Sequence, residues 1–327
     1  MLVSAVFGKC RVHLMPLLVL NVLAAVAESH VLPEFQNRFN DGAMTPCDAT
    51  CRSKLPPYPA FASEYLNLAE MAVTGSLMDE IGRCNGGGCA LEQAAPYNYS
   101  LRFRGNDWPP IGHTMVGHMR LHNVKAAIEA VVSAGIPGDF AELGVWRGGA
   151  SIYAQLVLKC LGQMEARRAL IFDAFEALAG KQVYGKASNF LSVTEHEVKH
   201  NFEKYGVLNT AHFFKGLFSD SLPKFAKQYR TEGRTIAVLR VDGNFYSSYQ
   251  DVLYELYRFV PVGGIVIFDD VMSHKGVQQF WIDFTRDYSM KELLHPIDDH
   301  SAWFRKERVV HVSRNKYHHL NDSWHAY

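Results

Sequence analysis

The sequence predicts an α/β fold in which helices cover both faces of a mostly parallel sheet. From residue 139 onward, short and almost continuously apolar runs alternate with segments whose apolar residues recur at helical spacing. Strands buried on both faces have this apolar character, and their alternation with helices is typical of parallel sheets. A glycine-rich turn at residues 144–149 joins the first apolar run to a helix, as in nucleotide-binding α/β proteins.

The expected elements follow one another in β-α order. Strands are expected at residues 139–143, 169–172, 211–214, 235–241 and 265–268, with edge strands at 295–297 and 303–305. Helices are expected between them at residues 150–161, 194–205, 221–228, 250–259 and 277–287, with Thr194 as the N-cap of the second. Two further helices are expected upstream, one from Ala60 and one that follows residue 117 and ends at Gly135.

The N-terminus has the pattern of a signal sequence. Lys9 and Arg11 precede an apolar run, residues 14–27, that ends in the cleavage pattern Ala25-Val26-Ala27. The run is short for a membrane span, so a cleaved signal peptide is expected, with a signal anchor as the alternative. The predicted organisation is a signal peptide or anchor at 1–27, an N-terminal extension at 28–107 and the main domain at 108–327. It implies the ER or Golgi lumen, or secretion, and no stable membrane span after cleavage.

The cysteines agree with an oxidising compartment. Cys47, Cys51, Cys84 and Cys89 form two close pairs in the extension, which predicts two disulfides of open connectivity. A four-cysteine zinc site is the competing interpretation. Cys160 is expected to be a buried free thiol. Two sequons, at Asn98 and Asn321, permit N-glycosylation.

The overall charge gives no sign of a polyanionic partner. Lys plus Arg and Asp plus Glu are both 33, and basic residues are not interleaved with aromatic ones. Nucleic-acid binding is therefore not expected. The stretch from residue 28 to about 60, with Pro46, Pro56, Pro57 and Pro59, is expected to be a poorly structured lead-in.

The glycine-rich turn differs from a dinucleotide fingerprint. Glu142 stands where the first glycine of G-x-G-x-x-G would be, and its charge would repel a pyrophosphate. It suits a cationic ligand such as S-adenosylmethionine, which carries a sulfonium and an ammonium group. The alternative is a tight βα turn in which Glu142 is merely solvated.

Carboxylates collect at the expected ends of the strands. Asp173 ends the second strand, where it can accept hydrogen bonds from a ribose. Asp242, Asp269 and Asp270 end two later strands and together offer the oxygen ligands that Mg²⁺ prefers. Such an ion would lower the pKa of a substrate hydroxyl group and orient it for methyl transfer. The alternative for each aspartate taken alone is a loop acid or a helix cap.

The sequence resembles the macrocin O-methyltransferase (TylF-like) family, whose members methylate sugar hydroxyls of natural products. The matching stretches are HTMVG at 113–117, GDFAELGVWRGG at 138–149, DAFE at 173–176, KGLFSDSLP at 215–223, LRVDGNFYSS at 239–248 and GGIVIFDD at 263–270. They occur in family order across roughly residues 108 to 306. The resemblance implies a Rossmann-like methyltransferase fold, S-adenosylmethionine as methyl donor, Mg²⁺, and a small-molecule or glycan hydroxyl as acceptor.

The resemblance also implies roles for individual residues. The implied metal ligands are Asp242, Asp269 and Asp270. The implied donor-site residues are Thr114, Met115, Glu142, Gly144, Val145, Trp146, Arg147, Gly148, Asp173, Phe175, Gly216 and Phe218.

One departure from the family pattern concerns catalysis. The family's motif is Asp-Gly-Asp, with the second aspartate as proposed base, whereas this chain has Asn244 there. An amide cannot take the proton. Either the metal alone acidifies the hydroxyl, or another residue accepts the proton, for which His274 and His300 are the candidates. A catalytically weak or inactive relative that still binds donor or glycan is one alternative. A metal-dependent glycosyltransferase is another, although Asp242-Gly243-Asn244 breaks its D-x-D motif. The identity of the acceptor and a homo-oligomeric state stay open.

Overall fold

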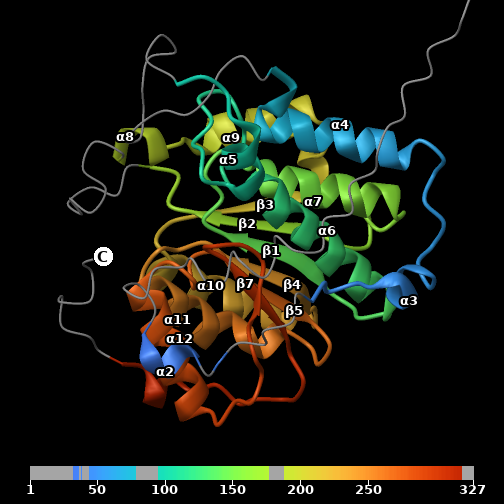
Figure 1. The fold of residues 1–327 in the computed structure, drawn as a ribbon. Helices are drawn as coiled ribbons and strands as arrows, with labels where there is room; N and C mark the ends of the chain where they lie inside the picture. Colours follow the sequence, from blue (N-terminus) through green and yellow to red (C-terminus); the bar gives the residue numbers. More distant parts are fainter. Residues whose placement is uncertain (1–31, 37, 39–43, 79–94, 177–187, 319–327) are drawn as a thin grey trace, which may run out of the picture. The chain divides into compact units, whose positions relative to one another are not determined.

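A seven-stranded sheet forms the centre of the structure, a computed structural model that describes residues 32–36, 38, 44–78, 95–176 and 188–318 (Figure 1). The strand order is β3-β2-β1-β4-β5-β7-β6. The strands are β1 Asp139–Leu143, β2 Ala169–Asp173, β3 Ala211–Lys215, β4 Ile236–Val241, β5 Ile265–Phe268, β6 His295–Pro296 and β7 Ala302–Arg305. Strands β1 to β5 pair in parallel, which confirms the predicted fold class.

The last two strands run against the others. β7 pairs antiparallel with β5, and β6 pairs antiparallel with β7. β6 is therefore an edge strand, as expected, but the prediction for residues 303–305 is wrong because β7 lies between two strands. Its residues Ala302, Trp303 and Phe304 are buried accordingly.

Side chains of successive strand residues point to opposite faces, and each face has its own hydrophobic core. On β4, Val238 packs in the core beneath α4, α6, α7 and α9, whereas its neighbour Leu239 packs in the core beneath α10, α11 and α12 (Figure 1). The helices of the first group are α4 Ala62–Thr74, α6 Gly117–Ser133, α7 Gly149–Cys160 and α9 Glu195–Lys204. Those of the second group are α10 Phe218–Thr231, α11 Tyr246–Leu256 and α12 Lys275–Asp287.

Short helices complete the described part of the chain. They are α2 Pro33–Gln36, α3 Ala49–Arg52, α5 Tyr99–Arg104 and α8 Ser188–Leu191, with 3-10 turns at Ser76–Met78, Leu208–Thr210, Tyr257–Phe259 and Arg314–Lys316. Among the described residues, none of the helices combines the length and hydropathy needed to cross a bilayer.

Two helices begin three or more residues earlier than predicted. α10 starts at Phe218 and α11 at Tyr246, three and four residues before the expected starts. Each first turn contains two serines, whereas the prediction relied on a run of apolar residues at helical spacing. The N-cap at Thr194 is confirmed, because its side chain accepts a hydrogen bond from the Glu197 backbone N–H at 3.2 Å.

The lead-in is more ordered than expected in its described parts. Cys47 and Cys51 form a disulfide, and Ser133 Oγ donates a hydrogen bond of 2.7 Å to the Cys51 carbonyl, which ties α3 to α6. Phe35 is fully buried in the core beneath α10–α12. The disulfide uses two of the four thiols that the zinc alternative requires. Cys84 and Cys89 lie outside the described residues.

Other expectations for single residues can be compared with the structure. Cys160 is a buried free cysteine, as predicted. Asn98 is exposed and caps α5, its side-chain oxygen accepting from the Leu101 N–H. Asn321 and the signal-like run at 14–27 lie outside the described residues. Helix α4, from the predicted extension, packs against α6 and α7.

Candidate functional site

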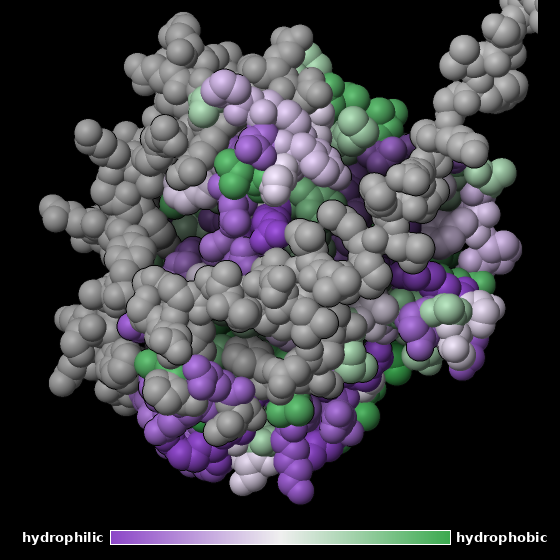
Figure 2. All heavy atoms as spheres, in the orientation of Figure 1, coloured by the Kyte–Doolittle hydropathy of each residue, from purple (hydrophilic) through white to green (hydrophobic). Residues whose placement is uncertain are grey.

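A cavity of about 500 Å³ opens at the carboxyl ends of β1, β2, β4 and β5. Figure 2 shows hydrophilic residues gathered in a hollow on the face viewed. In a parallel sheet this edge collects the loops that follow every strand, and ligands of α/β proteins bind there.

The backbone at this edge is strained. Trp146, Phe175 and Asn244 follow β1, β2 and β4 with φ of 48°, 51° and 58°, and only one other described non-glycine residue has a positive φ. Bulky aromatic residues adopt this conformation at a cost, and such strain concentrates at functional sites. Gly144 has φ of 86°, and a Cβ there would lie 1.9 Å from the Asp242 carbonyl oxygen. This glycine is required because β1 and β4 approach each other so closely where they end.

Nine of the twelve predicted donor-site residues line the cavity: Thr114, Met115, Glu142, Gly144, Val145, Trp146, Asp173, Gly216 and Phe218. Asp173 already accepts backbone hydrogen bonds from Val145 at 2.8 Å and Phe175 at 3.0 Å. Burial raises the pKa of Asp173 above its usual value, and these hydrogen bonds oppose that rise. The carboxylate also accepts from the Trp146 backbone N–H at 3.3 Å, and it thus fixes the turn after β1.

The other three predicted donor-site residues, Arg147, Gly148 and Phe175, do not line the cavity. Arg147 turns onto the preceding loop, where its guanidinium donates to the carbonyls of Pro110 and Gly112 at 3.0 Å each. At Gly148 a Cβ would lie 2.6 Å from the Phe202 ring, so the packing of α9 accounts for this glycine. The Phe175 side chain is buried in the core.

Glu142 is not a free charge in the cavity wall. It is 1% exposed, accepts a hydrogen bond from Ser151 Oγ, and pairs with the guanidinium of Arg240. Burial raises the pKa of Glu142, against the lowering effect of Arg240. The idea of a solvated glutamate in a tight turn is therefore wrong, and both carboxylate oxygens already have a donor from within the protein.

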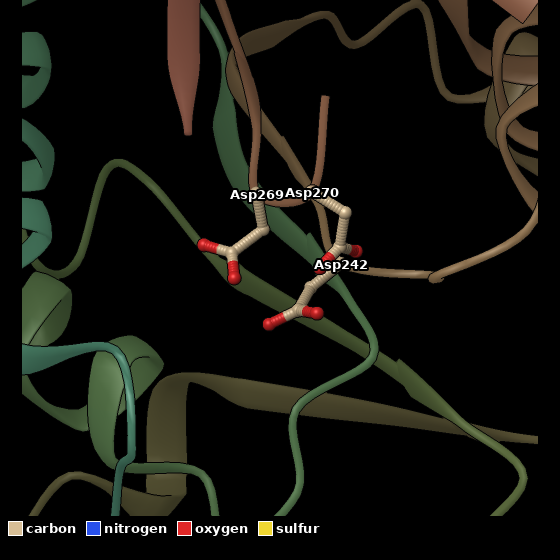
Figure 3. Close-up of side chains that lie close together, drawn as sticks. All are labelled: Asp242, Asp269 and Asp270. Atoms are coloured by element: carbon tan, nitrogen blue, oxygen red, sulfur yellow. The ribbon is translucent and has the colours of Figure 1, made fainter. Parts of the chain in front are cut away.

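The predicted metal ligands come together. Asp242, Asp269 and Asp270 each offer a carboxylate oxygen, and these oxygens lie within 4.8 Å of one another (Figure 3). Burial and the neighbouring Asp269 raise the pKa of Asp242, and burial likewise raises that of Asp270. Burial would also raise the pKa of Asp269, but Arg120 and Arg240 lower it below its usual value.

Two buried arginines contact this cluster. Arg120 donates to Asp269 at 2.8 Å and to Asp298 at 2.6 Å, and Arg240 pairs with Glu142, Asp242 and Asp269. Four carboxylates thus pair with two guanidinium groups, and Asp270 lies beside them as a fifth, which leaves an excess of negative charge. An oxygen-rich, anionic group of this kind fits a hard divalent cation.

The predicted catalytic residues also line the cavity. Asn244 donates its backbone N–H to Asp270 Oδ2 at 3.0 Å. His274 lies at the N-cap of α12, with Nδ1 2.9 Å from Ser273 Oγ. His300 Nε2 lies 2.7 Å from Asn106 Oδ1, and burial together with Arg120 lowers the pKa of His300.

Sequence reasoning missed several residues of the cavity wall, among them Trp108, Arg120 and Arg240. Trp108 stacks on Phe190 with ring planes 2° apart and gives the cavity an aromatic side. Arg240 had a signal in the sequence, since it is the one charged residue of an otherwise apolar strand. Arg120 had none, because charged residues are common on helices.

Comparison with known proteins places these features in a family. The family model described as macrocin-O-methyltransferase (TylF) matches residues 73–306. The demethyldecarbamoylnovobiocin O-methyltransferase of Streptomyces niveus is 34% identical over 223 residues, which are 65% of this chain and 82% of that protein. The mycinamicin III 3''-O-methyltransferase of Micromonospora griseorubida is 31% identical over 63% of this chain and 82% of its own length. The solved structure of the O-methyltransferase NovP superposes with a TM-score of 0.66 at 31% identity and covers 76% of this chain and 100% of that one.

Proposed function

Because the chain belongs to the macrocin O-methyltransferase family and is an O-methyltransferase, we propose that it transfers the methyl group of S-adenosylmethionine to a sugar hydroxyl of a glycoside. The observation that carries this proposal is one cavity that holds both the strand-end turns of a donor site and a cluster of three aspartates. A donor methyl and an acceptor hydroxyl have to meet in line, and a shared cavity allows this. Because the chain belongs to a methyltransferase family, the glycosyltransferase alternative is wrong.

The donor side of the cavity consists of the turns after β1, β2 and β3. Asp173 places its carboxylate in the cavity wall, where ribose hydroxyls can reach it, and Gly216 leaves room for the ligand close to the backbone. Phe218 and Leu217 offer apolar surface at the start of α10. We assign the methyl donor to this side.

The acceptor side has the chemistry of a sugar site. Trp108 offers apolar surface to the ring carbons, whereas Ser247, Asn244 and His300 offer polar groups for hydroxyls. We propose Mg²⁺ as the ion that Asp242, Asp269 and Asp270 would hold; when bound, it would lower the pKa of the acceptor hydroxyl. The proton then passes to His274 or His300, because the Asn244 amide is not basic.

The second candidate function, a weak or inactive relative, rests on Asn244. Its side chain lies in the wall beside Asp270, where the family pattern has a basic carboxylate. Such a protein would bind the donor without turnover, so binding and turnover need separate measurements.

The test is a titration of residues 28–327 with S-adenosylmethionine and S-adenosylhomocysteine by calorimetry, in Mg²⁺ and in EDTA. We expect both compounds to bind, and a mass-spectrometric screen of glycosides to reveal a product heavier by one methyl group. Binding without any methylated glycoside favours the inactive relative. The absence of donor binding in both buffers would contradict the proposed function.

We also propose a secretory location. The support is the signal-like run at residues 14–27 together with the Cys47–Cys51 disulfide, since such bonds persist in oxidising compartments. If Asn98 is exposed to the glycosylation machinery, glycosidase treatment of the expressed protein will increase its mobility. A protein that resists the glycosidase and stays with the cytosolic fraction would contradict this location.

A further inference from the structure

The side chain of Arg240 joins the two halves of the site. It is 1% exposed and lies opposite Glu142 in the β1–β4 register. One terminal nitrogen pairs with Glu142, and the other donates to Asp242 Oδ2 at 3.0 Å and to Asp269 Oδ1. One guanidinium therefore contacts two of the three proposed cation ligands and one residue of the predicted donor site.

Glu142 is occupied on both sides. Its Oε1 accepts from Arg240 and its Oε2 from Ser151 Oγ. A buried carboxylate that neutralises a buried guanidinium has little charge left to offer a ligand. This arrangement conflicts with the expectation that Glu142 recognises the positive charge of the methyl donor.

We propose that Arg240 is a positioning residue that arranges Asp242 and Asp269 for a divalent cation, and that Glu142 is the counter-charge that permits it. The inference rests on the proposed function, because it concerns the same site. In this proposal Glu142 supports the cation site and does not contact the methyl donor directly.

The physical reason is charge balance in a buried space. A guanidinium beside two ligand carboxylates orients them by directed hydrogen bonds, but its positive charge also opposes the binding of a cation there. Glu142 offsets that charge from the opposite side of the guanidinium. Arg120 is balanced in the same way by Asp298, which it contacts at 2.6 Å while it holds Asp269 at 2.8 Å.

The test replaces Glu142 with glutamine, which keeps the shape and one acceptor but removes the charge. Calorimetry then measures Mg²⁺ binding without donor, and S-adenosylhomocysteine binding in EDTA. We expect Glu142→Gln to lower the affinity for Mg²⁺ about tenfold, because the positive charge of Arg240 then lies uncompensated near the ion. The affinity for S-adenosylhomocysteine should change less than about twofold. S-adenosylhomocysteine is the right probe because it keeps the ammonium group but has no net charge.

Ser151→Ala is the matched control. It removes the other partner of Glu142 without changing any charge, so both dissociation constants should stay within about twofold of the wild type. Should Glu142→Gln fail to fold, Arg240→Lys replaces it. Lysine keeps the positive charge, but its single ammonium group cannot contact three carboxylates as the planar guanidinium does. We therefore expect weaker Mg²⁺ binding and an unchanged affinity for the donor.

The outcomes separate the inference from the proposed function. A loss of S-adenosylhomocysteine affinity in Glu142→Gln with unchanged Mg²⁺ affinity would overturn the inference and make Glu142 a donor ligand. A wild-type protein that binds no Mg²⁺ would overturn it too, while leaving methyl transfer intact. A wild-type protein that binds no S-adenosylhomocysteine would instead contradict the proposed function.

Discussion

Replacing Gly144 with alanine should destabilise the fold far more than the same replacement at Gly162. Both glycines have a positive φ, 86° and 67°, so an alanine at either position adopts a disfavoured backbone conformation. Their surroundings differ, because a Cβ at Gly144 would lie 1.9 Å from the Asp242 carbonyl oxygen, whereas a Cβ at Gly162 has no neighbour within 4 Å. The pair therefore separates backbone strain from close approach.

The magnitude follows from three contributions. The backbone conformation costs about 1 kcal/mol at either position. At Gly144 the overlap has to be relieved by moving β1 and β4 apart, which adds about 1–3 kcal/mol of packing strain. The movement weakens the hydrogen bond of 2.8 Å from the Asp242 N–H to the Leu143 carbonyl, worth about 1 kcal/mol. The expected total is about 3–5 kcal/mol for Gly144→Ala and about 1 kcal/mol for Gly162→Ala.

Urea unfolding followed by circular dichroism measures both variants against the wild type. Calorimetry on the folded Gly144→Ala protein should also show weaker Mg²⁺ binding, because the displaced carbonyl belongs to a proposed cation ligand. Gly162→Ala should bind Mg²⁺ like the wild type. If the two variants differ by less than about 1 kcal/mol in free energy of unfolding, the close approach of β1 and β4 is not what requires glycine.

Three further predictions concern the proton acceptor, the cation and pH. Asn244→Asp restores the acid of the family pattern and should raise turnover of any accepted glycoside by about tenfold or more, measured as product mass against time; unchanged turnover would exclude position 244 as the base. Asp270→Asn should abolish the rise in melting temperature that Mg²⁺ gives the wild type. The control is Asp220→Asn, which replaces an exposed acid on α10 and should keep the rise. An equal rise in both variants would place the ion elsewhere. Burial, with Lys204 and Arg147 nearby, lowers the pKa of His113 to about 4. Below pH 6.5 the unfolded chain therefore binds a proton at His113 more readily than the folded chain does. In urea titrations the free energy of unfolding of the wild type should fall by about 1–2 kcal/mol between pH 6.5 and 4, and His113→Gln should not show this part of the fall. An equal fall in both proteins would assign the effect to another group.

The strands and the site edge were predictable because their signals are local. β4 and β5 are buried on both faces, so each is an almost unbroken apolar run that can be recognised without knowing its neighbours. Asp242 and Asp269 come directly after such runs, and the carboxyl ends of parallel strands lie at one edge. Their convergence in Figure 3 follows from these two facts.

The helix starts were less predictable, again for a local reason. The start of α9 was predictable from Thr194, because threonine is a preferred N-cap residue. α10 and α11 begin without a side-chain cap, at Phe218 and Tyr246, and each first turn contains two serines. Nothing in those turns distinguishes them from loop until the sheet is in place.

Which side chains become partners was decided by the tertiary structure alone. The sequence placed Glu142 near the end of β1 and Arg147 in the turn that follows, but it carried no information on which groups their charges would contact. Glu142 pairs with Arg240, 98 positions away, because the parallel register of β1 and β4 sets the two opposite each other. Parallel register depends on how whole strands pack and not on either segment by itself. The sequence by itself therefore determined the elements, the family and the acidic edge, and the packing of the sheet determined which of those acids remain available to a ligand.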